Sequence, residues 1–248
     1  MILSKVHRFI FIKGIKVGGT SVEIALSRLC GPDDIVTPIT PIDELKRLDV
    51  DAGARNYSAD REAELAYLEA LRQTALLNLT AVTIPAGVYF NHSPLRDVLR
   101  LSGPDIEEYR VVCVERHPYA KIFSWANHKL SFEAYRTGGE MRAGRFELRR
   151  YLDQAVEDGS IVAVKNIDRY RRPDGSISAH VMRFENLNDD FQQFVAGLGI
   201  EYRVWLPHVK KGILANNLDP RDLLNKRQLT IINEIFCEEF EAFRYDPL

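Results

Sequence analysis

Residues 13–21 read Lys-Gly-Ile-Lys-Val-Gly-Gly-Thr-Ser, a stretch rich in glycine, lysine and hydroxyl side chains. Glycines let the backbone approach an anion closely, and N–H groups at the start of a helix point toward such a ligand. Lys16 adds a full positive charge, and Thr20 and Ser21 add hydroxyl donors. This segment, named the glycine loop, therefore predicts a site for phosphate or a related anion.

Two other interpretations of the glycine loop remain open. Its lysines could be solvated side chains without a ligand, or the loop could belong to a kinase or NTPase. The P-loop of such enzymes, G-x-x-x-x-G-K-[ST], requires a lysine directly before its final Ser or Thr. Here Gly19 occupies that position and Lys16 lies four residues before Thr20. The NTPase pattern is therefore not met.

Arg116 and Ser124 form a second set of groups that suit a phosphate. Residues 109–114 predict an apolar strand, and Arg116 follows its carboxyl end, where open sheets place ligands. Pro118 starts a predicted helix that runs to about Leu130 and places Ser124 in its second turn. A guanidinium fork with a nearby hydroxyl suits a phosphate. The alternative is a structural arginine that bridges two carboxylates.

The elements that must position these groups alternate between strand and helix. Apolar runs at residues 9–12 and 109–114 predict strands that are buried on both faces, and residues 180–184 predict a third strand. Helices are predicted from Ser21 onward, from Pro118, and by apolar periodicity at residues 60–79, about 188–198 and 226–243. This order predicts an α/β fold, with a central parallel sheet flanked by helices in one domain over residues 1–248.

Composition excludes several classes of protein. The 248 residues carry a formal net charge of −2, with 46% hydrophobic and 27% charged residues, as in an ordinary globular domain. The chain has no excess of basic charge that would suggest nucleic-acid binding. It also has no apolar stretch that approaches the roughly 20 residues of a membrane span. The three cysteines, Cys30, Cys113 and Cys237, are too widely spaced for a disulfide framework or a zinc motif. We therefore expect no metal and a cytoplasmic setting.

The glycine loop and residues 116–124 together resemble the sulfotransferases that use 3′-phosphoadenosine 5′-phosphosulfate (PAPS), most closely the carbohydrate and polysaccharide sulfotransferases. The loop is similar to that family's P-K-T-x-G-T-S motif, and residues 116–124 are similar to its R-[DN]-P-x-x-R-x-x-S motif. Ile15 and Val17 depart from the first motif, as His117 and Lys121 depart from the second. Other family-like segments follow in the same order, at residues 91–96, 183–200, 206–211 and 240–246.

The resemblance implies a P-loop-like, three-layer α/β fold and the transfer of a sulfuryl group from PAPS to an acceptor hydroxyl by in-line displacement. It assigns the 5′-phosphosulfate to the residues Lys16, Val17, Gly18, Gly19, Thr20 and Ser21. It assigns the 3′-phosphate to Arg116 and Ser124. Lys210 and Lys211 either belong to a loop that closes over this phosphate or are a solvated charge pair. Lys13 is either a further phosphate contact or a solvated side chain.

Two groups are candidates for the chemistry itself. Negative charge develops on the bridging oxygen of the leaving phosphate, so Lys16 is the expected stabilising cation and no metal is required. His92 is the expected general base because imidazole titrates near neutrality, although it could be a structural histidine instead. Glu62, Glu64 and Glu115 are weaker alternatives for the base.

The acceptor is expected to be a carbohydrate or a small molecule. Residues 41–90 and 131–178 lie between the family-like motifs and are expected to line its pocket. The second of these segments is rich in arginine, which suits an anionic acceptor or simply a solvated helix face. The arginines are Arg136, Arg142, Arg145, Arg149 and Arg150. A nucleotide or small-molecule kinase, and a non-catalytic nucleotide-binding protein, remain as alternative functions.

Overall fold

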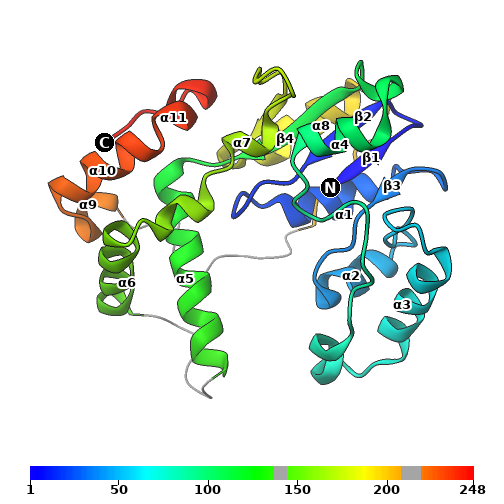
Figure 1. Ribbon diagram of the computed structural model, residues 1–248, viewed down its shortest axis with the longest axis horizontal. Helices are drawn as coiled ribbons and strands as arrows, with labels where there is room; N and C mark the ends of the chain where they lie inside the picture. Colours follow the sequence, from blue (N-terminus) through cyan, green and yellow to red (C-terminus); the bar gives the residue numbers. More distant parts are fainter. Residues whose placement is uncertain (137–143, 208–218) are drawn as a thin grey trace. The chain divides into compact units, whose positions relative to one another are not determined.

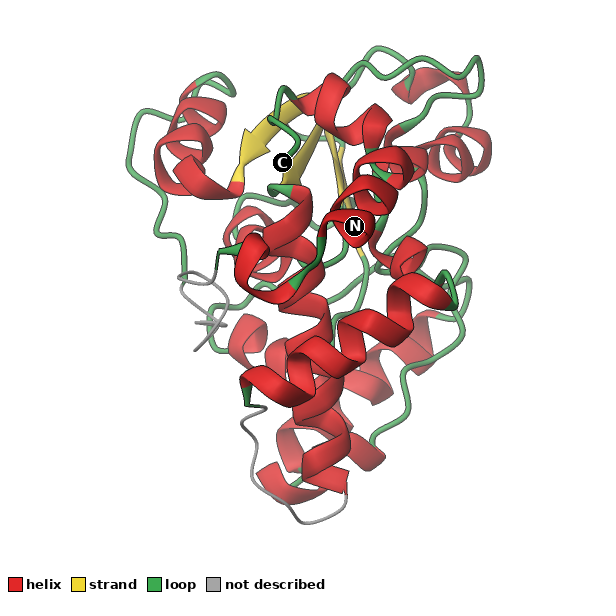
Figure 2. Cartoon of the chain, turned by 90° about the vertical axis from the view of Figure 1, so that its left-hand side faces the viewer, coloured by secondary structure: helices red, strands yellow, loops and turns green. Residues whose placement is uncertain are grey.

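The computed structural model describes residues 1–136, 144–207 and 219–248. The chain divides into two compact units. Among the described residues, the first unit contains residues 1–14, 18–114 and 169–207, and the second contains residues 15–17, 115–168 and 219–248. Helices make up most of the regular structure, and the strands are short (Figure 1, Figure 2).

A five-stranded sheet has the order β3-β1-β2-β4-β5. Its strands are β1 (Ile2–Ser4), β2 (Phe9–Ile12), β3 (Ile35–Val36), β4 (Arg110–Glu115) and β5 (His180–Arg183). β2 pairs with β4 in parallel, whereas β1 pairs antiparallel with both β2 and β3. Therefore β2, β3 and β4 run in one direction and β1 runs in the other. The predicted central sheet is thus mostly parallel, and β1 is its antiparallel strand. The sequence analysis missed β1 and β3, because their three and two residues are too few to show a periodicity.

The strands predicted from continuous apolar runs are buried in the sheet. All four side chains of β2 are fully buried, and Val111, Val112, Cys113 and Val114 of β4 are at most 2% exposed. Because successive side chains of a strand point to opposite faces, both faces of the sheet are covered at these strands. The α8 helix (Leu187–Ala196) provides part of this cover, since Phe9 and Phe194 meet edge to face with centroids 5.7 Å apart.

The first unit also contains the helices of the segment at residues 41–90. They are α2 (Pro41–Leu48), α3 (Arg61–Gln73) and the short 3₁₀ helix η1 (Leu76–Ala81). The single helix predicted for residues 60–79 therefore breaks near Thr74, whose backbone is extended and whose hydroxyl donates to the carbonyl of Ala70. The other described helices of this unit are α8, α1 (Gly19–Ser27), α4 (Leu95–Ser102), η2 (Pro104–Ile106) and η4 (Phe184–Asn186), and α7 (Ile167–Tyr170) has residues in both units.

The regular structure described for the second unit consists almost entirely of helices. They are α5 (Pro118–Arg136), α6 (Arg145–Glu157), η3 (Ser160–Val164), α9 (Pro220–Leu223), α10 (Lys226–Ile235) and α11 (Cys237–Phe243). The predicted start of α5 at Pro118 is confirmed. The last helix, predicted as continuous over residues 226–243, is instead two helices that meet at Phe236. This residue is fully buried.

A buried charge network lies inside the second unit and consists of Glu115, Lys121, Asn166 and Glu239. The ammonium group of Lys121 lies 2.7 Å from Glu115 and 2.6 Å from Glu239, and all three side chains are at most 1% exposed. Burial would lower the pKa of Lys121, but the two carboxylates raise it, so this lysine stays charged. Burial raises the pKa of Glu115, while Lys121 opposes that effect.

We predict that Lys121→Ala destabilises the protein by about 3–5 kcal/mol, because two buried carboxylates lose their shared cation. The free energy of unfolding in urea measures this loss. The control is Lys165→Ala, since Lys165 forms a partly exposed pair with Glu238 at 3.1 Å and surface pairs contribute about 0–1 kcal/mol. Equal losses in the two variants would show that the network does not depend on Lys121.

Candidate functional site

The glycine loop leaves the carboxyl end of β2 and leads into α1. Lys16 has φ of +62° and Gly18 has φ of +78°, so two residues of the loop adopt the left-handed conformation. That conformation is uncommon for a residue with a side chain, and such residues concentrate at functional sites. Turns that contain left-handed residues direct backbone N–H groups into concavities that bind anions. The geometry of the loop therefore suits an anion.

The start of α1 also favours the binding of an anion. Gly18 occupies the N-cap position and has no side chain to cap the helix, and the first turn contains no acidic residue. The partial positive charge of the helix N-terminus is therefore not compensated by a carboxylate of the helix itself. Thr20 and Ser21 lie in this first turn and are partly exposed, as is Lys16.

The glycines of the loop also have a packing role. A Cβ atom at Gly18 would lie 2.9 Å from the ring of Phe184, and one at Gly19 would lie 2.9 Å from Cγ of Lys13. Close packing therefore requires small residues at both positions, independently of any ligand. The side chain of Val17 is fully buried, so this residue can offer a ligand only its backbone.

Lys13 has neither of the roles expected for it. Only 5% of the residue is exposed, and its ammonium group lies 2.8 Å from Glu23 of α1, which also accepts a hydrogen bond from the amino group of Met1. Burial would raise the pKa of Glu23, but Lys13 and that amino group lower it to about 2. Lys13 is thus a structural cation that ties the start of the glycine loop to α1.

His92 contacts the glycine loop at Lys13. Its Nδ1 lies 3.0 Å from the backbone carbonyl of Lys13. A carbonyl only accepts hydrogen bonds, so Nδ1 carries the proton and Nε2 keeps a lone pair. Burial lowers the pKa of His92 to about 4, and the charge of Lys13 lowers it as well. His92 is therefore a neutral imidazole at pH 7, with one nitrogen able to accept a proton.

Arg116 and Ser124 follow β4, the parallel neighbour of β2. Ile12 of β2 pairs with Cys113 of β4, so the glycine loop and the segment that carries Arg116 begin at the same edge of the sheet. Arg116 is only 6% exposed, and its backbone N–H donates to the Glu115 carboxylate at 3.0 Å. Ser124 is partly exposed in the second turn of α5, as predicted.

The remaining candidates divide into three cases. Lys210 and Lys211 lie outside the described residues. Glu64 is buried and accepts hydrogen bonds from the backbone of Asn56 and Ser58, and Glu115 belongs to the buried charge network. These two carboxylates thus have structural partners, whereas Glu62 is exposed on α3.

The structure adds one residue that the sequence analysis missed. The side chain of Asn166 forms two hydrogen bonds with the backbone of Ile15 in the glycine loop. The two residues are 151 positions apart, and no motif surrounds Asn166 in the sequence. Only the tertiary structure reveals this contact.

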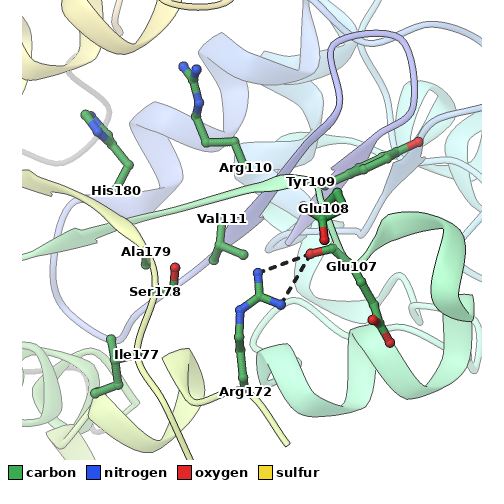
Figure 3. Close-up of a pocket in the computed structure, with 10 residues that line it drawn as sticks. All are labelled: Glu107, Glu108, Tyr109, Arg110, Val111, Arg172, Ile177, Ser178, Ala179 and His180. Carbon is green, nitrogen blue, oxygen red and sulfur yellow. Dashed lines mark hydrogen bonds between the residues drawn. The ribbon is translucent and has the colours of Figure 1, made fainter. Parts of the chain in front are cut away.

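A pocket of about 420 Å³ lies at the opposite edge of the sheet, beside the amino end of β4 (Figure 3). In this view Arg110 and His180 lie on one side of β4 and Arg172 lies on the other. Arg172 donates to the carbonyl of Glu107 at 3.2 and 3.3 Å, and Arg110 donates to the carbonyl of Gly197 at 3.1 Å. These cations do not converge, so the pocket offers no arrangement that favours an anion.

A second pocket, of about 360 Å³, lies between α5 and α6 in the second unit. It belongs to the segment expected to line the acceptor pocket. Carboxylates predominate among its charged lining residues, which are Glu133, Glu147, Arg150 and Asp158. Of the arginines that suggested an anionic acceptor, Arg145 instead pairs with Asp222 at 2.8 Å.

Comparison with protein-family models, curated proteins and solved structures finds no match for the chain. Within the part of the chain that the structure describes, no helix combines the length and apolar character needed to cross a membrane. The geometry of the candidate residues is therefore the basis for the function proposed below, together with the sequence resemblance.

We predict that His92 titrates with a pKa of about 4 in the folded protein, well below the ordinary value of 6.5. The unfolded state then binds more protons between these two values, so stability falls as pH decreases from 6.5 to 4. The loss attributable to His92 is about 3 kcal/mol. NMR of ¹⁵N-labelled imidazoles measures the pKa and identifies the tautomer.

The control is His92→Gln, which keeps a donor for the Lys13 carbonyl but does not titrate. The wild type should lose more stability than this variant over the same pH interval. A His92 pKa near 6.5, or identical pH dependence of the two proteins, would contradict the buried, neutral imidazole.

Proposed function

We propose that this protein is a PAPS-dependent sulfotransferase with a P-loop-like fold, acting on a hydroxyl of a carbohydrate or small molecule. The observation that carries the proposal is the conformation of the glycine loop, in which Lys16 and Gly18 are left-handed and Gly18 is the N-cap residue of α1. The loop begins beside the strand that leads to Arg116. The ordered resemblance of the sequence to carbohydrate sulfotransferases supports the same function.

The described residues fit the anionic groups of PAPS. The backbone of residues 16–19 and the hydroxyls of Thr20 and Ser21 form a set of donors suited to the 5′-phosphosulfate. Arg116 and Ser124 supply a guanidinium and a hydroxyl for the 3′-phosphate. When bound, PAPS supplies an activated sulfuryl group on a phosphate leaving group.

Lys16 would stabilise the departing phosphate. Its partly exposed side chain belongs to the loop that would hold the phosphosulfate, and a fixed cation lowers the barrier where negative charge develops. Lys13 cannot take this role because its ammonium group is buried and paired with Glu23. Lys16 is thus the cation of the loop that suits the leaving group.

His92 would accept the proton of the acceptor hydroxyl. The Lys13 carbonyl holds its Nδ1–H, so the lone pair of Nε2 is the basic site. A pKa of about 4 makes it a weak base in the free protein. An anionic ligand in the adjacent glycine loop would raise that pKa, because a negative charge stabilises the imidazolium ion.

We predict that the wild-type protein binds 3′-phosphoadenosine 5′-phosphate, the product nucleotide, with micromolar affinity in a calorimetric titration. Arg116→Ala should weaken binding by at least about tenfold, since a charge-assisted hydrogen bond contributes roughly 1.5–3 kcal/mol. The matched control is Arg100→Ala, because Arg100 is an exposed residue of α4 with a 3.8 Å surface pair.

Magnesium–ATP is the competing ligand in the same titration. Binding of ATP instead of the product nucleotide would support a kinase and overturn the proposal. Nucleotide binding without sulfuryl transfer to any hydroxyl acceptor would indicate a non-catalytic binding protein. Failure of a folded wild type to bind the product nucleotide would also overturn it.

We further predict that Lys16→Ala lowers kcat for sulfuryl transfer by about 10²–10³-fold, the range observed when one electrostatic stabiliser of a transition state is removed. Its affinity for the product nucleotide should fall much less. The measurement is transfer of ³⁵S-labelled sulfate from PAPS to a panel of mono- and oligosaccharides. An unchanged kcat would exclude Lys16 from the chemical step.

A further inference from the structure

The backbone of Ile15 is held by one distant side chain. Its N–H donates to Oδ1 of Asn166 at 2.8 Å, and its carbonyl accepts from Nδ2 of the same residue at 3.2 Å. Both residues belong to the second unit. A planar carboxamide that satisfies both polar groups of one residue restrains the backbone there, because rotation of either adjoining peptide would break a hydrogen bond.

Asn166 is in turn held by two carboxylates of the buried charge network. Its Nδ2 lies 3.3 Å from Glu115, and its backbone N–H donates to Glu239 of α11. Glu239 also accepts from the backbone of Ile167 at 3.1 Å. Asn166 and Glu239 are fully buried. Movement of the carboxamide would leave buried polar groups unpaired, which costs more than the hydrogen bonds themselves contribute.

The restrained carbonyl of Ile15 belongs to the same peptide unit as the N–H of Lys16. In a planar trans peptide these two groups point in opposite directions, so the direction of one determines the direction of the other. Lys16 adopts φ of +62°, a conformation that costs about 1–3 kcal/mol for a residue other than glycine unless its surroundings impose it. The hydrogen bonds of Asn166 act directly on the peptide that precedes this strained residue.

We propose that Asn166 is a positioning residue of the glycine loop, and that Glu239 holds it in place. Asn166 orients the Ile15–Lys16 peptide, and thereby the N–H and the starting direction of the Lys16 side chain, before a ligand binds. The α11 helix is thus coupled to the conformation of the loop. The identity of the ligand rests on the proposed function, whereas the restraint on the loop does not.

The test uses two measurements on Asn166→Ala in the full chain. Hydrogen exchange of the Ile15 amide, followed by NMR, should accelerate by at least about tenfold because the amide loses its acceptor. The affinity for 3′-phosphoadenosine 5′-phosphate should fall by about tenfold, since two hydrogen bonds that preorganise the loop are removed. Thermal unfolding of the same samples shows whether the variant is folded.

Asn166→Asp provides a readout that a purely structural residue would not affect. The variant keeps an acceptor for the Ile15 N–H but replaces the donor with a carboxyl group beside Glu115. A protonated carboxyl restores a donor, so the affinity of this variant should recover toward the wild-type value as pH falls. The difference between variant and wild type is compared at each pH, which removes effects of pH on the ligand itself.

Glu239→Gln and Glu238→Gln form a matched pair of neighbours on α11. Glu239 is buried and bonds to the backbone of Asn166, whereas Glu238 is partly exposed and pairs with Lys165. Ile15 exchange should accelerate and affinity should fall several-fold for Glu239→Gln, but neither should change for Glu238→Gln.

Failure of this inference can be distinguished from failure of the proposed function. If the wild type binds no product nucleotide, the proposed function fails, and Ile15 exchange alone decides the role of Asn166. If the wild type binds and Asn166→Ala binds equally well, the positioning role is wrong, even with faster exchange. If Asn166→Ala does not fold, Asn166→Asp and Glu239→Gln decide by the same two readouts.

Discussion

The parallel pairing of β2 with β4 is the constraint on which the candidate site depends. It joins residues about a hundred positions apart, and its register places Ile12 opposite Cys113. Both strands are buried on both faces, so a shift in their register would expose apolar side chains and bury polar ones. As a result, the glycine loop and the segment that carries Arg116 begin at neighbouring strand ends. Each segment then owes its conformation to contacts of its own.

Those contacts include buried ion pairs in both units. Glu23 pairs with Lys13 in the first unit, and Lys121 pairs with two carboxylates in the second. Desolvation offsets much of the attraction within a buried pair, so such pairs add little net stability. Their geometry is demanding, however, because an unpaired buried charge is costly. The glycine loop is thus restrained at two positions near its start, at Lys13 by the pair with Glu23 and at Ile15 by Asn166 of the buried charge network.

The sequence predicted the strands and helices that have a long apolar run or a clear starting residue. The apolar runs at residues 9–12 and 109–114 became β2 and β4, and Pro118 began α5. β1 and β3 were missed, because three and two residues are too few to show a pattern. The breaks near Thr74 and at Phe236 were also missed, because the apolar periodicity of the sequence continues across both positions.

The sequence by itself determined which residues could bind an anion, because side-chain charge and glycine content are local properties. It also determined that the loop follows a buried strand and precedes a helix. Only the tertiary structure decided that Lys13 is a buried partner of Glu23, that His92 donates Nδ1–H to the loop, and that Asn166 holds Ile15. These outcomes depend on burial and on contacts between residues up to 151 positions apart. Desolvation and hydrogen-bond geometry arise from the folded chain, and no local pattern encodes them.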